Sequence, residues 1–158
     1  MNSANTAHQE LVRAATVTLN QCFAQVQDEL VHVVLDMLGG HPETLATVAI
    51  DTLKGSRVTF LETIDTVHKV IPFLPKARAQ KLKSMVFGAE DIWALADGFL
   101  RTLASSNKPN QVICFELTDR CTGMTVPVAL PAESHIFLAA EISKTLRKLK
   151  KFHKKIHD

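Results

Sequence analysis

The stretch AHQELVRAATVTLNQCFAQVQDELVHVVLDML, from Ala7 to Leu38, decides the fold class. Apolar residues recur along it seven apart, with further ones between them, at Val12, Leu19, Val26 and Val33. This spacing aligns them as one stripe on an amphipathic α-helix. The pair Gly39 and Gly40 then supplies a C-cap. The sequence therefore predicts one long first helix, whose apolar stripe other helices must cover.

Turn-forming residues divide the next part of the chain into four shorter predicted helices, over residues 42–54, 57–71, 76–87 and 89–106. Ser56 is expected to cap the helix over 57–71, and Gly88 is expected to end the one over 76–87. Glu90 and Asp91 would then lie in the first turn of the following helix, where the helix dipole favours acidic side chains.

The pattern changes at residues 111–130, where two segments rich in β-branched residues flank the turn-forming cluster TDRCTG. They predict a β-hairpin, with Pro127 on an edge strand or with its nitrogen facing outward. A last helix is expected over 132–157. The predicted fold class is mainly α: a single domain over 1–158, a bundle of about six helices with the hairpin inserted before a basic amphipathic C-terminal helix.

Charge is distributed unevenly along the chain. The net charge is +2, yet residues 1–143 carry eleven Lys and Arg against fifteen Asp and Glu, whereas residues 144–158 carry seven against one. The body is thus −4 and the tail +6, an asymmetry typical of proteins that contact nucleic acid or membranes. The first ten residues lack the features of a secretory signal, so we expect an intracellular protein. Its expected location is the cytoplasm, including the surface of a membrane, or the nucleus.

Motifs for chemistry are missing from the sequence. Gly39 and Gly40 are not followed by the Lys-Ser/Thr of a phosphate-binding loop. His153 and His157 lie one helical turn apart, but two ligands do not complete a zinc site. Cys114 falls in an apolar strand and is expected in the core, while Cys121 falls in the hairpin turn and is expected to be exposed. We therefore predict no catalytic residues, metal or cofactor, and no enzymatic activity.

Seven basic residues form the candidate site, and on a helix they flank a thin apolar stripe that ends in Phe152 and Ile156. They are Lys144, Arg147, Lys148, Lys150, Lys151, Lys154 and Lys155. We expect them to contact an anionic surface, with a lipid membrane slightly favoured over nucleic acid because the stripe persists to the end of the chain. Alternatively, the stripe packs into the bundle and the lysines are a solvated face; burial of Phe152 and Ile156 would favour this interpretation.

The predicted hairpin leaves a different class of function open. An exposed strand edge can pair with another chain, so the hairpin is a candidate for contact with a protein partner or for self-association. In that case the protein would be a self-assembling structural subunit of a coat or scaffold, binding nucleic acid through its basic tail.

Overall fold

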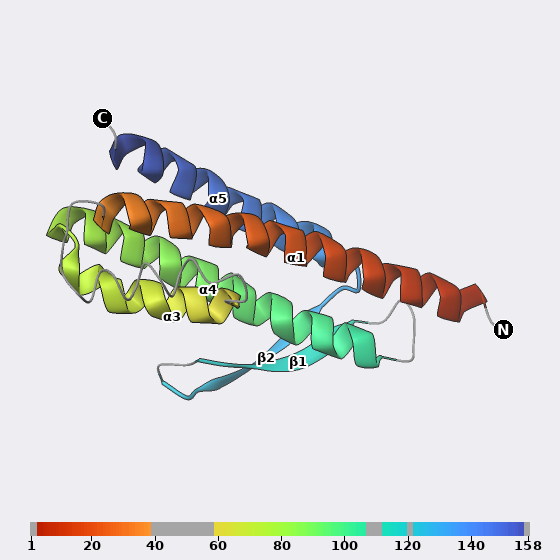
Figure 1. The fold of residues 1–158 in the computed structure, drawn as a ribbon. Coiled ribbons are helices and arrows are strands. Elements are labelled where there is room, and N and C mark those ends of the chain that lie inside the picture. The colour runs from red at the N-terminus through yellow and green to blue at the C-terminus, as the bar shows by residue number, and fades with distance from the viewer. Residues whose placement is uncertain (1–2, 39–58, 107–111, 120–121, 157–158) are drawn as a thin grey trace. The chain divides into compact units, whose positions relative to one another are not determined.

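A computed structural model describes residues 3–38, 59–106, 112–119 and 122–156. In chain order these residues form α1 (Ser3–Leu38), α3 (Phe60–Val70), the short 3-10 helix η1 (Ile71–Phe73), α4 (Lys76–Ser105), β1 (Ile113–Thr118), β2 (Thr125–Leu130) and α5 (His135–Ile156) (Figure 1). The described part of the chain is thus mainly α with one hairpin, as predicted. The helix expected over 42–54 lies outside the described residues.

The prediction of about six helices was too high, because α4 is one continuous helix where two were expected. Gly88 lies inside it and does not end it. A glycine in a helix interior costs about 1 kcal/mol relative to alanine, which burial of neighbouring side chains can offset. Val86 and Ala89 are both buried on either side of Gly88. Glu90 therefore occupies no first turn, and its carboxylate lies 3.4 Å from His68 Nε2 on α3.

The chain divides into two compact units, and three long helices contribute to both. The first unit comprises Met1–Cys22 and Asp91–Glu141, and the second comprises Phe23–Glu90 and Ile142–Asp158. That the whole chain acts as a single domain stays a prediction.

In the first unit the hairpin packs against the second part of α4. β1 and β2 pair antiparallel, with Phe115 opposite Val128, so alternate residues share one apolar face. Ile113 on this face is buried. The ring of Phe115 covers Gly98 so closely that a Cβ there would lie 2.7 Å from two ring carbons. Gly98 is needed for this close approach of helix and strand.

Pro127 sits where a missing N–H does no harm to the hairpin. The amide of Asp119 donates to the carbonyl of Met124 at 2.8 Å, which makes these two a hydrogen-bonded pair. Such pairs alternate along an antiparallel ladder, so Pro127 and Glu116 form a non-hydrogen-bonded pair. The nitrogen of Pro127 therefore faces away from β1, as the sequence indicated.

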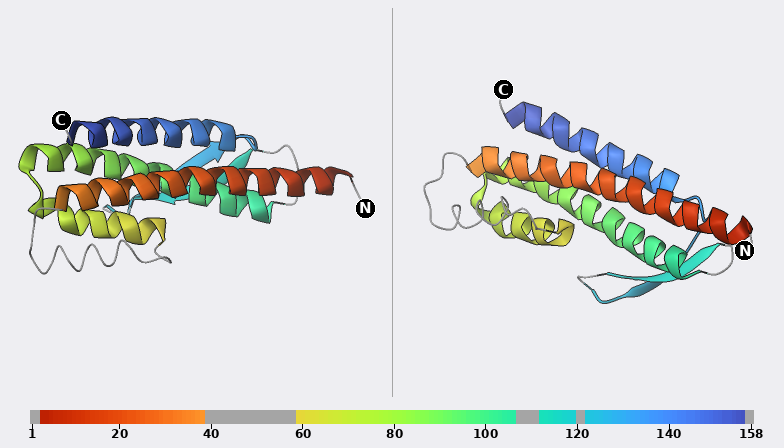
Figure 2. Two further views of the ribbon diagram at one scale, coloured as in Figure 1. Left: turned by 45° about the horizontal axis from the view of Figure 1, so that its top comes forward. Right: turned by 45° about the vertical axis from the view of Figure 1, so that its right-hand side comes forward.

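The second unit is built from the second part of α1, α3, the first part of α4 and the second part of α5. Its core contains apolar side chains from all four helices, among them Leu30, Ile64, Leu82 and Leu149, each fully buried. The ring centroids of Phe23 and Phe60 lie 5.0 Å apart in an edge-to-face arrangement. Figure 2 shows α3 beside the first part of α4. His68 on α3 and Glu90 on α4 connect these two helices.

Both α3 and α5 begin later than expected. The hydroxyl of Thr59 caps α3 by accepting a hydrogen bond from the amide of Glu62 at 3.2 Å. In turn, the amide of Thr59 donates a hydrogen bond to the Glu62 carboxylate. This capping box fixes the start at Phe60. The expected cap, Ser56, is outside the described residues. α5 begins at His135 because Pro131–Ser134 form a turn, closed by the Ser134 amide donating to the Pro131 carbonyl.

Candidate anionic-surface contact on α5

The second part of α5 separates apolar from basic side chains, as its sequence spacing predicts. Ile142, Leu149 and Phe152 are buried, and Ile156 is half-buried. All seven basic residues of the candidate site are exposed. The side chain of Phe152 is only 8% exposed, which favours the interpretation that the stripe packs into the protein's own core. The basic residues therefore lie on a helix whose apolar face packs into the core of the protein.

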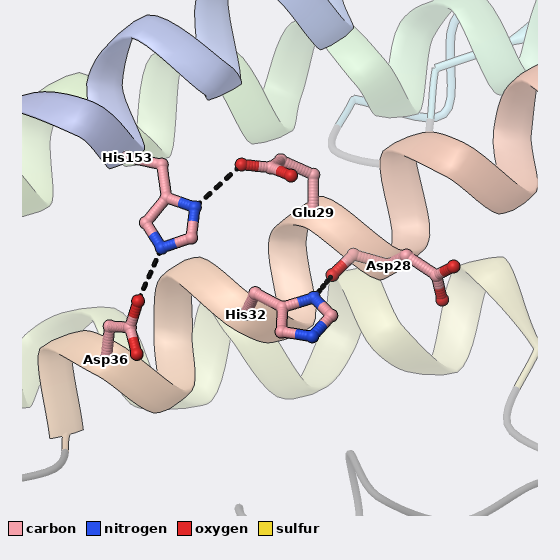
Figure 3. A network of polar contacts seen from close by, with 5 residues as sticks. All are labelled: Asp28, Glu29, His32, Asp36 and His153. Carbon is pink, nitrogen blue, oxygen red and sulfur yellow. Dashed lines mark hydrogen bonds and ion pairs between the residues drawn. The ribbon is translucent and has the colours of Figure 1, made fainter.

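His153 holds this part of α5 against α1 (Figure 3). Its Nδ1 lies 2.7 Å from a carboxylate oxygen of Glu29, and its Nε2 contacts the carboxylate of Asp36. The hydrogen bond with Asp36 raises the pKa of His153 above its ordinary value, and Glu29 adds to the effect while partial burial opposes it. A protonated imidazole donates through both nitrogens, so it can satisfy both carboxylates at once.

This contact could not be predicted from the sequence. Glu29 and Asp36 are 124 and 117 residues from His153 along the chain. His32, which is also on α1, is exposed, and its Nδ1 lies 2.7 Å from the carbonyl oxygen of Asp28. The sequence spacing of His153 relates it only to His157, one helical turn away. Within the described ranges, no group of three or more His, Cys, Asp or Glu is arranged to hold a metal ion.

A groove of about 310 Å³ lies between α5 and the first part of α4, and we call it the lysine groove. Four lysines line it together with Ser84, Met85 and Phe152: Lys81 from α4, and Lys148, Lys151 and Lys155 from α5. The three α5 lysines share one helix flank, and the two turns from 148 to 155 span about 10 Å at 1.5 Å per residue. The lining contains no acidic side chain.

Charge in the second unit is separated between helices. From Phe23 to Leu38, α1 carries Asp28, Glu29 and Asp36 and no Lys or Arg, whereas α5 from Ile142 to Ile156 carries seven basic residues and no acid. None of the four groove lysines forms an ion pair with any residue that the structure describes. Arg147, Lys150 and Lys154 are also exposed and lie beside the groove lysines around the axis of α5, and we call these three the outer flank. Positive charge is thus concentrated on the exposed face of one helix.

Two of the three cysteines lie in the described part of the chain, and their surroundings differ. Burial raises the pKa of the half-buried Cys22 thiol, which disfavours its reactive thiolate form. Cys114 is exposed, so its expected place in the core was wrong. It alternates with Ile113 and Phe115 along β1, and the pleat directs it to the other face of the hairpin. Cys121 lies outside the described residues.

Comparison of the chain with protein-family models, with curated proteins and with solved structures finds no match. None of the helices in the described part of the chain combines the length and apolar character that a membrane-crossing segment needs.

Proposed function

We propose that this protein is a non-catalytic interaction protein whose basic C-terminal helix contacts the surface of an anionic membrane. One observation carries the proposal: α5 exposes seven basic side chains while its apolar stripe is buried in the second unit. Each basic residue near an anionic bilayer contributes about 1 kcal/mol of attraction. The contact is therefore electrostatic, made at the headgroups, and α5 stays in the fold without inserting its apolar stripe.

Two features favour a membrane over nucleic acid as the anionic surface. Arg147 is the only arginine on α5, and Phe152, the only aromatic residue in its second part, is buried and so not exposed for stacking on a base. Sequence readout of duplex DNA relies on Arg, Asn or Gln, and single-strand binding relies on exposed aromatic rings. The lining of the lysine groove also includes the apolar side chains of Met85 and Phe152, which suit a lipid better than a phosphate backbone.

Co-sedimentation with vesicles tests the proposal. The full chain is mixed with neutral phosphatidylcholine vesicles and with vesicles containing phosphatidylserine, at low and at physiological salt. We expect binding to the anionic vesicles alone, and weaker binding at the higher salt because screening shortens the range of the interaction to about 8 Å. Equal binding to both vesicle types would contradict an electrostatic contact.

Charge reversal on the outer flank locates the contact. The double variant Arg147→Glu/Lys154→Glu should bind anionic vesicles at least about thirty-fold more weakly, because two attractions of about 1 kcal/mol each are removed. The matched control is Lys69→Glu/Lys83→Glu, which makes the same charge change at exposed positions on α3 and α4. An equal loss in both variants would show that only net charge matters. Tighter binding of the wild-type chain to duplex DNA than to vesicles would favour nucleic acid instead.

A further inference from the structure

The lysine groove has the composition of a site for a compact, highly charged anion. Four lysines line one space of about 310 Å³, with no acidic residue among the lining residues. Like charges on the same groove repel one another, and a multivalent anion bound between them would remove that repulsion. A volume near the lower end of the range for ligand pockets suits a single headgroup.

The other lining residues narrow the class of ligand. Ser84 contributes a hydroxyl that can donate to a phosphate oxygen, whereas Met85 and Phe152 contribute apolar surface. Lysine binds phosphate as a point charge with three donors, so several phosphates can be held without fixed planar geometry. A ligand with phosphates on one side and a carbon ring or glycerol unit on the other matches both kinds of surface.

The groove walls are held in place by contacts within the second unit. Phe152 is buried in the groove floor, and the next residue, His153, is bonded to Glu29 and Asp36 on α1. On the opposite wall, Lys81 directly precedes the fully buried Leu82 of α4. The backbone positions from which the lysines extend are therefore set before a ligand arrives, which lowers the ordering cost of binding.

We propose that the lysine groove binds the headgroup of a lipid that carries more than one phosphate, so that the protein selects such lipids within an anionic membrane. This inference rests on the proposed membrane contact and assigns Lys81, on a different helix, to the site. Phosphatidylserine, with one net charge, is contacted by the outer flank and does not need the groove.

Two vesicle types matched in total charge test this selectivity. One contains phosphatidylserine, and the other replaces part of it by an inositol phospholipid with two ring phosphates. We expect at least tenfold tighter binding to the second type, and saturable one-to-one binding of soluble inositol trisphosphate measured by calorimetry. Equal binding to the two vesicle types overturns the inference and leaves the membrane contact standing.

Single charge reversals separate the groove from the outer flank. Lys81→Glu should remove the tenfold preference and weaken inositol trisphosphate binding at least tenfold, while binding to phosphatidylserine vesicles changes less than threefold. Arg147→Glu is the matched control. It should weaken binding to phosphatidylserine vesicles and leave both the tenfold preference and the binding of inositol trisphosphate in place. Both positions are exposed, and circular dichroism verifies that each variant keeps its helices.

The remaining outcomes each decide between the two proposals. Unchanged inositol trisphosphate binding in Lys81→Glu overturns the groove as its site. Binding of inositol trisphosphate without binding to either vesicle type overturns the lipid as the ligand and the membrane contact with it. Release of inositol trisphosphate from the wild-type chain by duplex DNA, dependent on Lys81, would assign the groove to nucleic acid and overturn the inference.

Discussion

Replacing His153 by glutamine should make the stability of the protein less dependent on pH. In the folded protein His153 bridges Glu29 and Asp36, and its pKa is raised. A group whose folded-state pKa lies above its unfolded value stabilises the fold when it is protonated. This contribution is complete below the ordinary histidine pKa and is lost as the pH rises through the raised value. Glutamine keeps a hydrogen-bond donor but cannot take up the proton.

The size of the effect follows from the exposure of the three side chains. His153 and Glu29 are 21% and 17% exposed, so we assign their charge-assisted bond about 1.5 kcal/mol. Asp36 is 39% exposed, and solvent screening reduces its contribution to about 0.5 kcal/mol. His153→Gln should therefore lower the free energy of unfolding by about 2 kcal/mol at about pH 6, a decrease of roughly 4–8 °C in Tm.

At about pH 9 the same substitution should cost less than about 0.5 kcal/mol, because a neutral imidazole has only one N–H to donate. Urea unfolding followed by circular dichroism at the two pH values measures both differences. The control is His32→Gln, which changes an exposed histidine on α1 whose ring contacts a carbonyl of its own helix. An equal loss of stability at both pH values in His153→Gln would refute the charge argument and leave packing as the cause.

Four further substitutions test the packing, and the effect of each is measured by urea or thermal unfolding. Gly98→Ala should destabilise the protein by about 1–3 kcal/mol because the new Cβ would meet the Phe115 ring. Gly88→Ala in the same helix should stabilise the protein by about 0.5–1 kcal/mol, because nothing lies within 4 Å of the added Cβ. A stabilising Gly98→Ala together with a destabilising Gly88→Ala would contradict the close contact. Thr59→Ala should cost about 1 kcal/mol through loss of the capping box, and an unchanged Tm would mean that the cap is dispensable. Leu149→Ala should cost about 2–5 kcal/mol, since this fully buried side chain leaves a cavity, and a loss below about 1 kcal/mol would place α5 outside the core.

The parts of the fold that depend on local pattern could be predicted from the sequence. The stripe through Leu19, Val26 and Val33 is buried along α1, and the hairpin predicted within residues 111–130 is formed by β1 and β2. The continuity of α4 could not be predicted in the same way. Gly88 is a helix stop by local propensity, and only the burial of side chains before and after it makes the helix continue.

The candidate site likewise has a part that the sequence pattern predicts and a part that depends on how the helices pack. Helical periodicity predicted that Lys144, Lys148, Lys151 and Lys155 share one flank of the last helix, and the last three of these line the lysine groove. Periodicity could not supply the opposite wall, because the neighbour that Lys81 faces depends on how the helices pack. The contact of His153 with α1 has the same origin, since its partners are more than a hundred residues away.

The outward nitrogen of Pro127 makes the two edges of the hairpin unequal. The free edge of β2 lacks a donor at its third residue, whereas β1 contains no proline and offers Glu116 with its amide directed outward. An open-ended filament would need the β1 edge of one molecule to pair with the β2 edge of the next, and Pro127 interrupts that pairing. Pairing of β1 with β1 of a second copy would instead use the strand edge that has no proline in both molecules. We therefore expect that any self-association through this hairpin would stop at a four-stranded dimer.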